Sequence, residues 1–103
     1  MIPAVKQRLD EVRALCRRFG VARLELFGSA TQPTQFDPAD SDLDFLVEFG
    51  VLPPGGNADA YFGLKEALEG LFGRPVDLVM TRAIRNRFFL QAVAGQRELL
   101  YAA

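Results

Sequence analysis

The chain contains no histidine and only one cysteine, Cys16, among its 103 residues. Without histidine, the chain alone cannot form a Ser-His-Asp triad or a Cys-His dyad. One cysteine cannot form an internal disulfide, and one cysteine without histidine does not supply the usual zinc site. If the chain is an enzyme, its reactive groups must therefore be carboxylates, hydroxyls, arginines or a bound metal.

Long apolar runs and a surplus of one charge are also missing. The longest apolar run covers residues 99–103, far short of the roughly 20 residues that span a bilayer. The formal net charge is −1, so the whole chain has no electrostatic attraction for nucleic acid. The sequence reaches Lys6 and Arg8 without an apolar core, so we expect no secretion signal and no membrane partner. We predict a cytoplasmic protein with a reduced cysteine.

Hydrophobic periodicity predicts a single domain over residues 1–103 in which helices and strands alternate. Apolar residues at steps of three and four predict helices from Pro3 to Gly20, from Asn57 as N-cap to Gly73, and from Thr81 to Gly95. Apolar stretches predict strands over 22–27, 42–49 and 75–80, with a last edge strand over 98–101. This order predicts an α+β (α/β) fold. Cys16 is expected in its core, because it lies on the apolar stripe of the first helix.

Two aspartates, Asp42 and Asp44, lie two positions apart at the start of the second predicted strand. Their side chains share one face, because successive side chains of a strand alternate between faces. Two adjacent carboxylates repel each other, and a divalent cation relieves that repulsion. Mg²⁺ is commonly held by one or two carboxylates together with substrate phosphates. The pair therefore suits a metal–nucleotide complex, although a solvated strand start would look the same in isolation.

A third carboxylate, Asp77, lies inside the short apolar strand predicted over residues 75–80. Such a carboxylate is costly unless a partner offsets its charge. On an adjacent strand it would stand beside Asp42 and Asp44, and three carboxylates around two Mg²⁺ ions would form a clamp for in-line attack on phosphorus. The alternative is an ordinary salt bridge from Asp77 to Arg74 or Arg82.

Gly28 and Ser29 end the first predicted strand abruptly. Such a turn presents backbone N–H groups and a hydroxyl, and turn amides bind phosphate oxygens, although an ordinary turn is the alternative. Charge is also uneven, since residues 36–50 contain five acidic and no basic residues, whereas residues 73–87 contain four arginines and one aspartate. An acidic and a basic region in one small domain suit a metal bound beside an anion.

Competing motifs fit less well. The spacing of Asp40, Asp42 and Asp44 suggests an EF-hand loop, but Phe45 stands where that loop requires glycine. No Gly-Lys-Ser/Thr follows Gly28, which excludes a P-loop. Two acidic residues also occur in glycosidases, but a domain this small lacks the groove for a sugar chain.

The motifs together resemble the minimal nucleotidyltransferases, the smallest members of the DNA polymerase β-like nucleotidyltransferase superfamily. The residues that carry the resemblance are Leu-Phe-Gly-Ser at 26–29, Ser-Asp-Leu-Asp-Phe-Leu-Val-Glu-Phe at 41–49 and Pro-Val-Asp-Leu-Val at 75–79. The resemblance runs from near Arg23 almost to the C-terminus, and residues 97–101 resemble the family's closing strand. It implies a small mixed β-sheet with helices packed on it, similar to the polymerase β palm, and an exposed active-site cleft.

The resemblance also implies a reaction and the residues that perform it. A nucleoside monophosphate, AMP from ATP, would pass to an acceptor hydroxyl with release of pyrophosphate. Gly28 and Ser29 would hold the β and γ phosphates. Asp42 and Asp44 would ligate two Mg²⁺ ions, and Asp77 would ligate the catalytic ion and help to deprotonate the acceptor.

The resemblance further implies a protein partner. Many small members of the family are encoded beside a HEPN-domain toxin, and the nucleotidyltransferase, acting as the antitoxin, adenylylates a tyrosine of that toxin and silences it. The resemblance therefore implies a HEPN toxin as the acceptor.

Two features depart from the family pattern. Residues 30–33, Ala-Thr-Gln-Pro, replace a run that commonly contains an arginine able to pair with triphosphate. Arg82, Arg85 or Arg87 could supply that charge instead, or could form a solvated helix face. In addition, 12 residues separate Ser29 from Asp42, more than is common in the family.

Two other functions remain open at the level of sequence. The first is a catalytically weak binding module that neutralises a partner by contact, with Phe36 or Phe89 in the interface. The second is transfer to a small molecule, which would require a separate partner to provide the acceptor. Polymerisation of nucleic acid is not expected, because no basic groove is evident.

Overall fold

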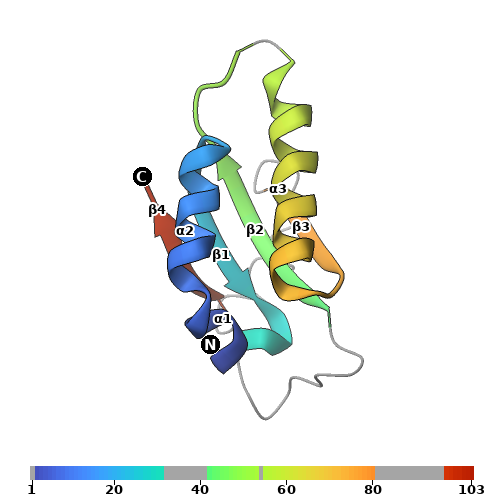
Figure 1. The fold of residues 1–103 in the computed structure, drawn as a ribbon. Helices are drawn as coiled ribbons and strands as arrows, with labels where there is room; N and C mark the ends of the chain where they lie inside the picture. Colours follow the sequence, from blue (N-terminus) through green and yellow to red (C-terminus); the bar gives the residue numbers. More distant parts are fainter. Residues whose placement is uncertain (1, 32–41, 54, 81–96) are drawn as a thin grey trace.

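A four-stranded mixed sheet is the centre of the computed structural model, which describes residues 2–31, 42–53, 55–80 and 97–103 (Figure 1). Its strands are β1 (Val21–Phe27), β2 (Leu43–Phe49), β3 (Val76–Met80) and β4 (Arg97–Ala102), in the order β3-β2-β1-β4. The four predicted strands are thus confirmed, each within two residues at its ends. Asp42 directly precedes β2 instead of lying inside it.

Strand directions bring four strand ends to one edge of this sheet. β1 is antiparallel to both β2 and β4, whereas β2 and β3 are parallel. The parallel pair requires a crossover, and a helix between β2 and β3 provides it. The end of β1 and the starts of the other three strands therefore lie together, at the edge to which the sequence motifs belong.

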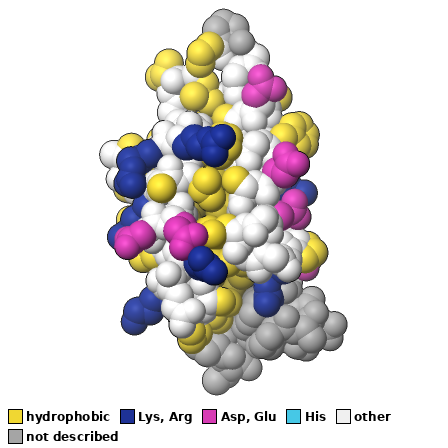
Figure 2. All heavy atoms as spheres, viewed as in Figure 1, with side chains coloured by type: hydrophobic (Ala, Val, Ile, Leu, Met, Phe, Trp, Pro, Cys, Tyr) yellow, Lys and Arg dark blue, Asp and Glu magenta, His cyan; other side chains and the backbone are white. Residues whose placement is uncertain are grey.

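Three helices cover one face of the sheet (Figure 1). They are α1 (Pro3–Gln7), α2 (Leu9–Arg18) and α3 (Gly56–Phe72). Apolar side chains lie between the helices when the molecule is viewed from this side, with charged side chains around them (Figure 2). Cys16 is fully buried in this layer, as predicted. The main core joins helical side chains such as Val12 and Leu64 to the strand residues Leu24, Leu26, Leu43, Phe45, Val47, Val76, Leu78 and Leu100.

The opposite face of the sheet has a smaller apolar cluster. Phe27 and Leu46 are buried there and Val79 packs against them. Because side chains alternate along a strand, Glu25, Asp44 and Asp77 share this second face. Because Leu46 is buried in this smaller cluster while Phe45 and Val47 lie in the main core, β2 is covered on both faces at its centre.

The structure corrects the first and second predicted helices. The helix predicted from Pro3 to Gly20 is broken at Arg8, whose φ of −105° and ψ of 11° are not helical. The segment before the break contacts a part of the chain that is distant in sequence. The Ile2 amide donates a hydrogen bond to the Ala30 carbonyl at 3.0 Å. Asn57 is not the N-cap of α3, because Gly55, with a φ of 78°, holds that position.

The third predicted helix, from Thr81 to Gly95, lies outside the described residues. Within the described ranges, no helix is long and apolar enough to cross a membrane.

Candidate active site

One row of side chains crosses the motif-bearing edge of the sheet. Asp77 on β3 pairs in register with Asp44 on β2, and Asp44 pairs with Phe27 on β1. Phe27 in turn pairs with Arg97 on β4. Residues paired across neighbouring strands point to the same face, so the row carries two acids, an aromatic ring and a cation. The prediction that Asp77 lies on a strand adjacent to Asp44 is confirmed.

Asp44 is the most strongly perturbed carboxylate of this row. The pKa of Asp44 is raised from 3.8 to about 6, mainly by partial burial and also by the neighbouring charges of Asp77 and Asp42. The carboxylates of Asp42 and Asp77 are therefore close enough to influence the charge of Asp44. Perturbation by burial together with specific neighbours is typical of functional sites, although structural clusters show it too.

Gly28 brings the end of β1 against Asp44. It begins a short 3₁₀ helix, η1 (Gly28–Thr31), with a φ of 76°. A Cβ atom at Gly28 would lie 2.8 Å from Oδ2 of Asp44, so only glycine allows this approach. The Thr31 hydroxyl closes η1 by donating to the Gly28 carbonyl at 2.7 Å. The Gly28–Ser29 segment, expected as a tight turn that presents backbone N–H groups, is thus a turn of 3₁₀ helix beside Asp44.

The chemistry of the donors fits Mg²⁺, but the three carboxylates are not a preformed cage. Asp42 and Asp77 are exposed and Asp44 is partly buried. Among residues 2–31, 42–53, 55–80 and 97–103, no three acidic, histidine or cysteine side chains are placed to hold a metal ion. The neighbouring charges of Asp77 and Asp42, which together with burial raise the pKa of Asp44, are nevertheless of the kind that a divalent cation offsets.

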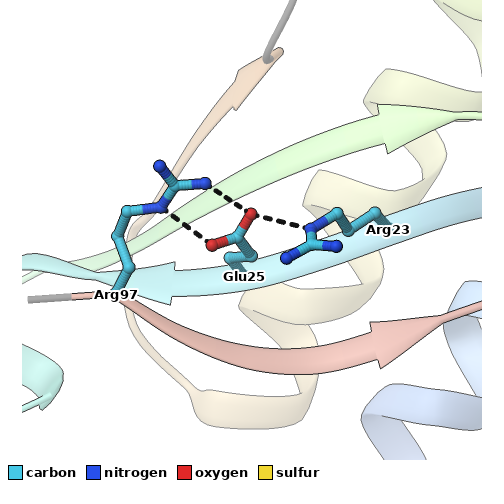
Figure 3. Close-up of polar contacts among 3 residues, drawn as sticks. All are labelled: Arg23, Glu25 and Arg97. Atoms are coloured by element: carbon cyan, nitrogen blue, oxygen red, sulfur yellow. Dashed lines mark hydrogen bonds and ion pairs between the residues drawn. The ribbon is translucent and has the colours of Figure 1, made fainter. Parts of the chain in front are cut away.

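A buried ion-pair network on the same face was missed by the sequence analysis. Glu25 is only 7% exposed and lies between Arg97 of β4 and Arg23 of its own strand (Figure 3). Nε and Nη2 of Arg97 donate to its two carboxylate oxygens at 2.8 and 2.7 Å, and Nε of Arg23 donates at 2.9 Å. These hydrogen bonds, above all those from Arg97, lower the pKa of Glu25.

The only sequence signal for this network was the presence of two charged residues, Arg23 and Glu25, in a strand whose other residues are apolar. The three arginines considered as phosphate ligands, Arg82, Arg85 and Arg87, lie outside the described residues.

Comparison with known proteins decides the family. Residues 11–98 match the family model of the nucleotidyltransferase domain. The chain belongs to this family. The match contains Gly28, Asp42, Asp44 and Asp77, so the row of carboxylates lies within the part of the chain that defines the family.

Individual relatives agree with this family. The protein adenylyltransferase MntA of Thermococcus cleftensis is 36% identical over 89 residues, which cover 86% of this chain and 82% of that protein. A crystal structure of a toxin–antitoxin with AMP-PNP matches at 26% identity and a TM-score of 0.67, over 92% of this chain and 73% of that chain. A structure of a tri-AMPylated Shewanella oneidensis HEPN toxin with its MNT antitoxin shows the same fold at 22% identity and a TM-score of 0.63, over 95% and 72%.

Proposed function

We propose that this nucleotidyltransferase domain moves AMP from ATP to a hydroxyl of a partner protein, a tyrosine of a HEPN toxin, and thereby acts as an antitoxin. The observation that carries the proposal is the packing of Gly28 against Asp44, with Asp77 on the next strand and Asp42 just before β2. Oxygen donors for a metal and turn amides for phosphate thus meet at one edge of the sheet. The resemblance to protein adenylyltransferase MntA supports AMP as the group transferred.

Each residue of the site has a part in this reaction. The backbone N–H groups of Gly28 and Ser29 donate to phosphate oxygens of the nucleotide. Asp42, Asp44 and Asp77 would hold two Mg²⁺ ions, and the bound ions would supply charge stabilisation at the reacting phosphate. The acceptor oxygen forms a bond to the α-phosphorus as the bond to the bridging oxygen breaks and pyrophosphate leaves. Asp77, exposed beside Asp44, takes up the proton of the acceptor hydroxyl.

Two further expectations belong to this proposal. We propose that residues 1–103 form one nucleotidyltransferase domain, which is supported by the single sheet shared by all described strands. We also propose that the protein works in the cytoplasm, where ATP and Mg²⁺ are available.

The test is label transfer from α-phosphate-labelled ATP to a purified HEPN-domain protein from the same genome, with and without Mg²⁺. We expect a labelled HEPN protein that depends on Mg²⁺ and is absent with Asp42→Asn/Asp44→Asn. Mass spectrometry of the labelled protein would identify the modified residue. Transfer that is unchanged by the two substitutions would contradict the mechanism.

The second candidate, a binding module, is favoured by one observation, the lack of a preformed metal cage among the described residues. Co-expression of the toxin with the Asp42→Asn/Asp44→Asn/Asp77→Asn variant separates the two functions. A binding module would still restore growth, whereas an adenylyltransferase with this mechanism would not.

A further inference from the structure

The face of the sheet that carries Asp44 and Asp77 also carries Arg97, a cation that does not use all of its hydrogen-bond donors to bind Glu25. Arg97 lies at the start of β4, in register with Phe27, which directly precedes Gly28. β4 also packs against η1, the segment that contains Gly28 and Ser29. One strand separates Arg97 from Asp44, so their backbones are about 10 Å apart at the usual spacing of strands. This distance is comparable with the extent of a triphosphate.

Glu25 fixes the orientation of the Arg97 guanidinium. The two hydrogen bonds from Nε and Nη2 occupy one edge of the guanidinium plane. The guanidinium has five N–H groups in a rigid plane, so three remain on the other edges. Figure 3 shows the remaining terminal nitrogen of Arg97 directed away from Glu25.

The charge of the network remains positive although Arg97 is paired. Glu25 is shared by two guanidinium groups, since Oε1 accepts hydrogen bonds from both Arg23 and Arg97. Two cations and one anion leave a net charge of +1 beside the acidic site. The Arg97 side chain is 28% exposed, against 9% for that of Glu25, so the cation is accessible while its anchor is buried.

We propose that Arg97 is a nucleotide-binding residue that contacts a phosphate oxygen of ATP bound at the Gly28–Asp44 edge of the sheet, with Glu25 as its positioning residue. This inference rests on the proposed function, because it takes ATP as the substrate. It adds a third group to the site. The site would then consist of carboxylates on β2 and β3, turn amides at the end of β1 and the cation of Arg97 on β4. An arginine suits this position because its rigid plane engages a carboxylate on one edge and a phosphate on another.

Isothermal titration of the full chain with ATP and Mg²⁺ tests the proposal, because it reads nucleotide affinity without requiring transfer. Arg97→Gln is expected to weaken ATP binding by about tenfold or more, the usual scale for a lost charged hydrogen bond. Arg23→Gln is the matched control, because it removes the same charge from a residue that also hydrogen-bonds Glu25. Arg23 lies four residues before Phe27 and is therefore farther along β1 from Gly28. We expect Arg23→Gln to stay within about twofold of the wild type.

A second variant distinguishes a loss of ATP binding from a loss of stability. Arg97→Gln leaves Glu25 with one partner fewer, which can destabilise the fold, whereas Glu25→Gln/Arg97→Gln replaces the charge pair by neutral groups of similar shape. The double variant is expected to melt close to the wild type and still to bind ATP about tenfold more weakly.

Three outcomes overturn the proposal in distinguishable ways. Equal ATP affinity of the wild type and Arg97→Gln would overturn the role of Arg97 and leave the proposed function standing. Equal losses in Arg97→Gln and Arg23→Gln would show a general charge effect and also overturn it. A wild type that binds none of the four nucleoside triphosphates would overturn the proposed function, and this inference with it.

Discussion

At the scale of single residues, Gly28 is the position where backbone conformation and chemistry depend on each other. Its φ of 76° disfavours any other residue, and its missing Cβ leaves room for the carboxylate of Asp44. We expect Gly28→Ala to lower stability by about 1–2 kcal/mol and nucleotide transfer by at least about tenfold, because it displaces Asp44. Initial rates of label transfer and urea denaturation measure the two effects.

Gly55→Ala is the matched control for this substitution. Gly55 has a φ of 78°, and nothing lies within 4 Å of the Cβ it would acquire. Gly55→Ala therefore introduces the same backbone strain as Gly28→Ala, but the new Cβ displaces no neighbouring side chain. Similar losses of transfer in both variants would show that Gly28 contributes only backbone conformation.

Asp44 should weaken the folded protein at neutral pH in a buffer free of divalent cations. Its pKa of about 6 in the folded state lies above the ordinary 3.8, so the folded state holds this proton more tightly than the unfolded state. The carboxyl therefore costs no stability below about pH 4, and its full cost is present above about pH 6.

We accordingly expect Asp44→Asn to raise the melting temperature at about pH 7.5 in the presence of a chelator, and to have little effect at about pH 4. The gain is limited to about 1 kcal/mol, because the partly exposed site is screened by water. Thermal melts at the two pH values measure it. A variant that is less stable than the wild type at neutral pH would contradict the charge repulsion described for the three aspartates.

At the scale of elements, Glu25 ties β1 to β4. Its pKa is lowered by the hydrogen bonds from Arg97 and Arg23, so its contribution to stability is present above pH 4.5 and is lost as the pH falls through the folded pKa. We expect Glu25→Gln to destabilise the protein by about 2 kcal/mol at neutral pH, with a smaller effect in acid.

The exposed pair of Arg8 and Glu11, whose side chains are 52% and 50% exposed, offers the comparison for Glu25. Glu11→Gln should change stability by less than about 0.5 kcal/mol, because exposed ion pairs contribute little. Urea denaturation of both variants checks the difference. Equal effects would mean that the burial of Glu25 does not matter.

The packing of α2 against α3 depends on a second close approach. A Cβ at Gly63 of α3 would lie 2.6 Å from Cε1 of Phe19, at the end of α2. Gly63→Ala is therefore expected to destabilise the protein by about 1–3 kcal/mol. Gly70, on the same helix, has nothing within 4 Å, so Gly70→Ala should stabilise it by about 0.5–1 kcal/mol. Thermal unfolding of the two variants should shift in opposite directions, and shifts in the same direction would contradict this packing.

At the scale of the whole molecule, local sequence patterns predicted where the helices and strands lie better than they predicted the contacts between these elements. The strands were located from apolar stretches because burial against helices requires such residues, whatever the order of the strands. The break at Arg8 could not be predicted, because the apolar residues Val5, Leu9 and Val12 continue at helical spacing across it. The N-cap of α3 was misplaced because Gly55, a residue free to adopt a positive φ, stands before the better capping residue Asn57.

The same holds for the candidate site: the sequence predicted its residues better than their arrangement in space. The motifs identified Asp42, Asp44, Asp77 and Gly28, and an adjacent third strand was expected for Asp77. The parallel register that sets Asp77 beside Asp44 came only from the structure. Arg97 was expected in the closing strand but not in the site, because it lies 72 positions from Glu25 and no local pattern links the two.

The most direct test of the central claim is the rate of AMP transfer to a HEPN-domain protein by Asp77→Asn compared with Asp59→Asn. Asp59 is an exposed aspartate in the first turn of α3, away from the row of carboxylates, so its substitution removes the same charge elsewhere. We predict that Asp77→Asn lowers the rate by at least about a hundredfold, whereas Asp59→Asn leaves it unchanged. Equal rates for the two variants would contradict a reaction carried by these carboxylates.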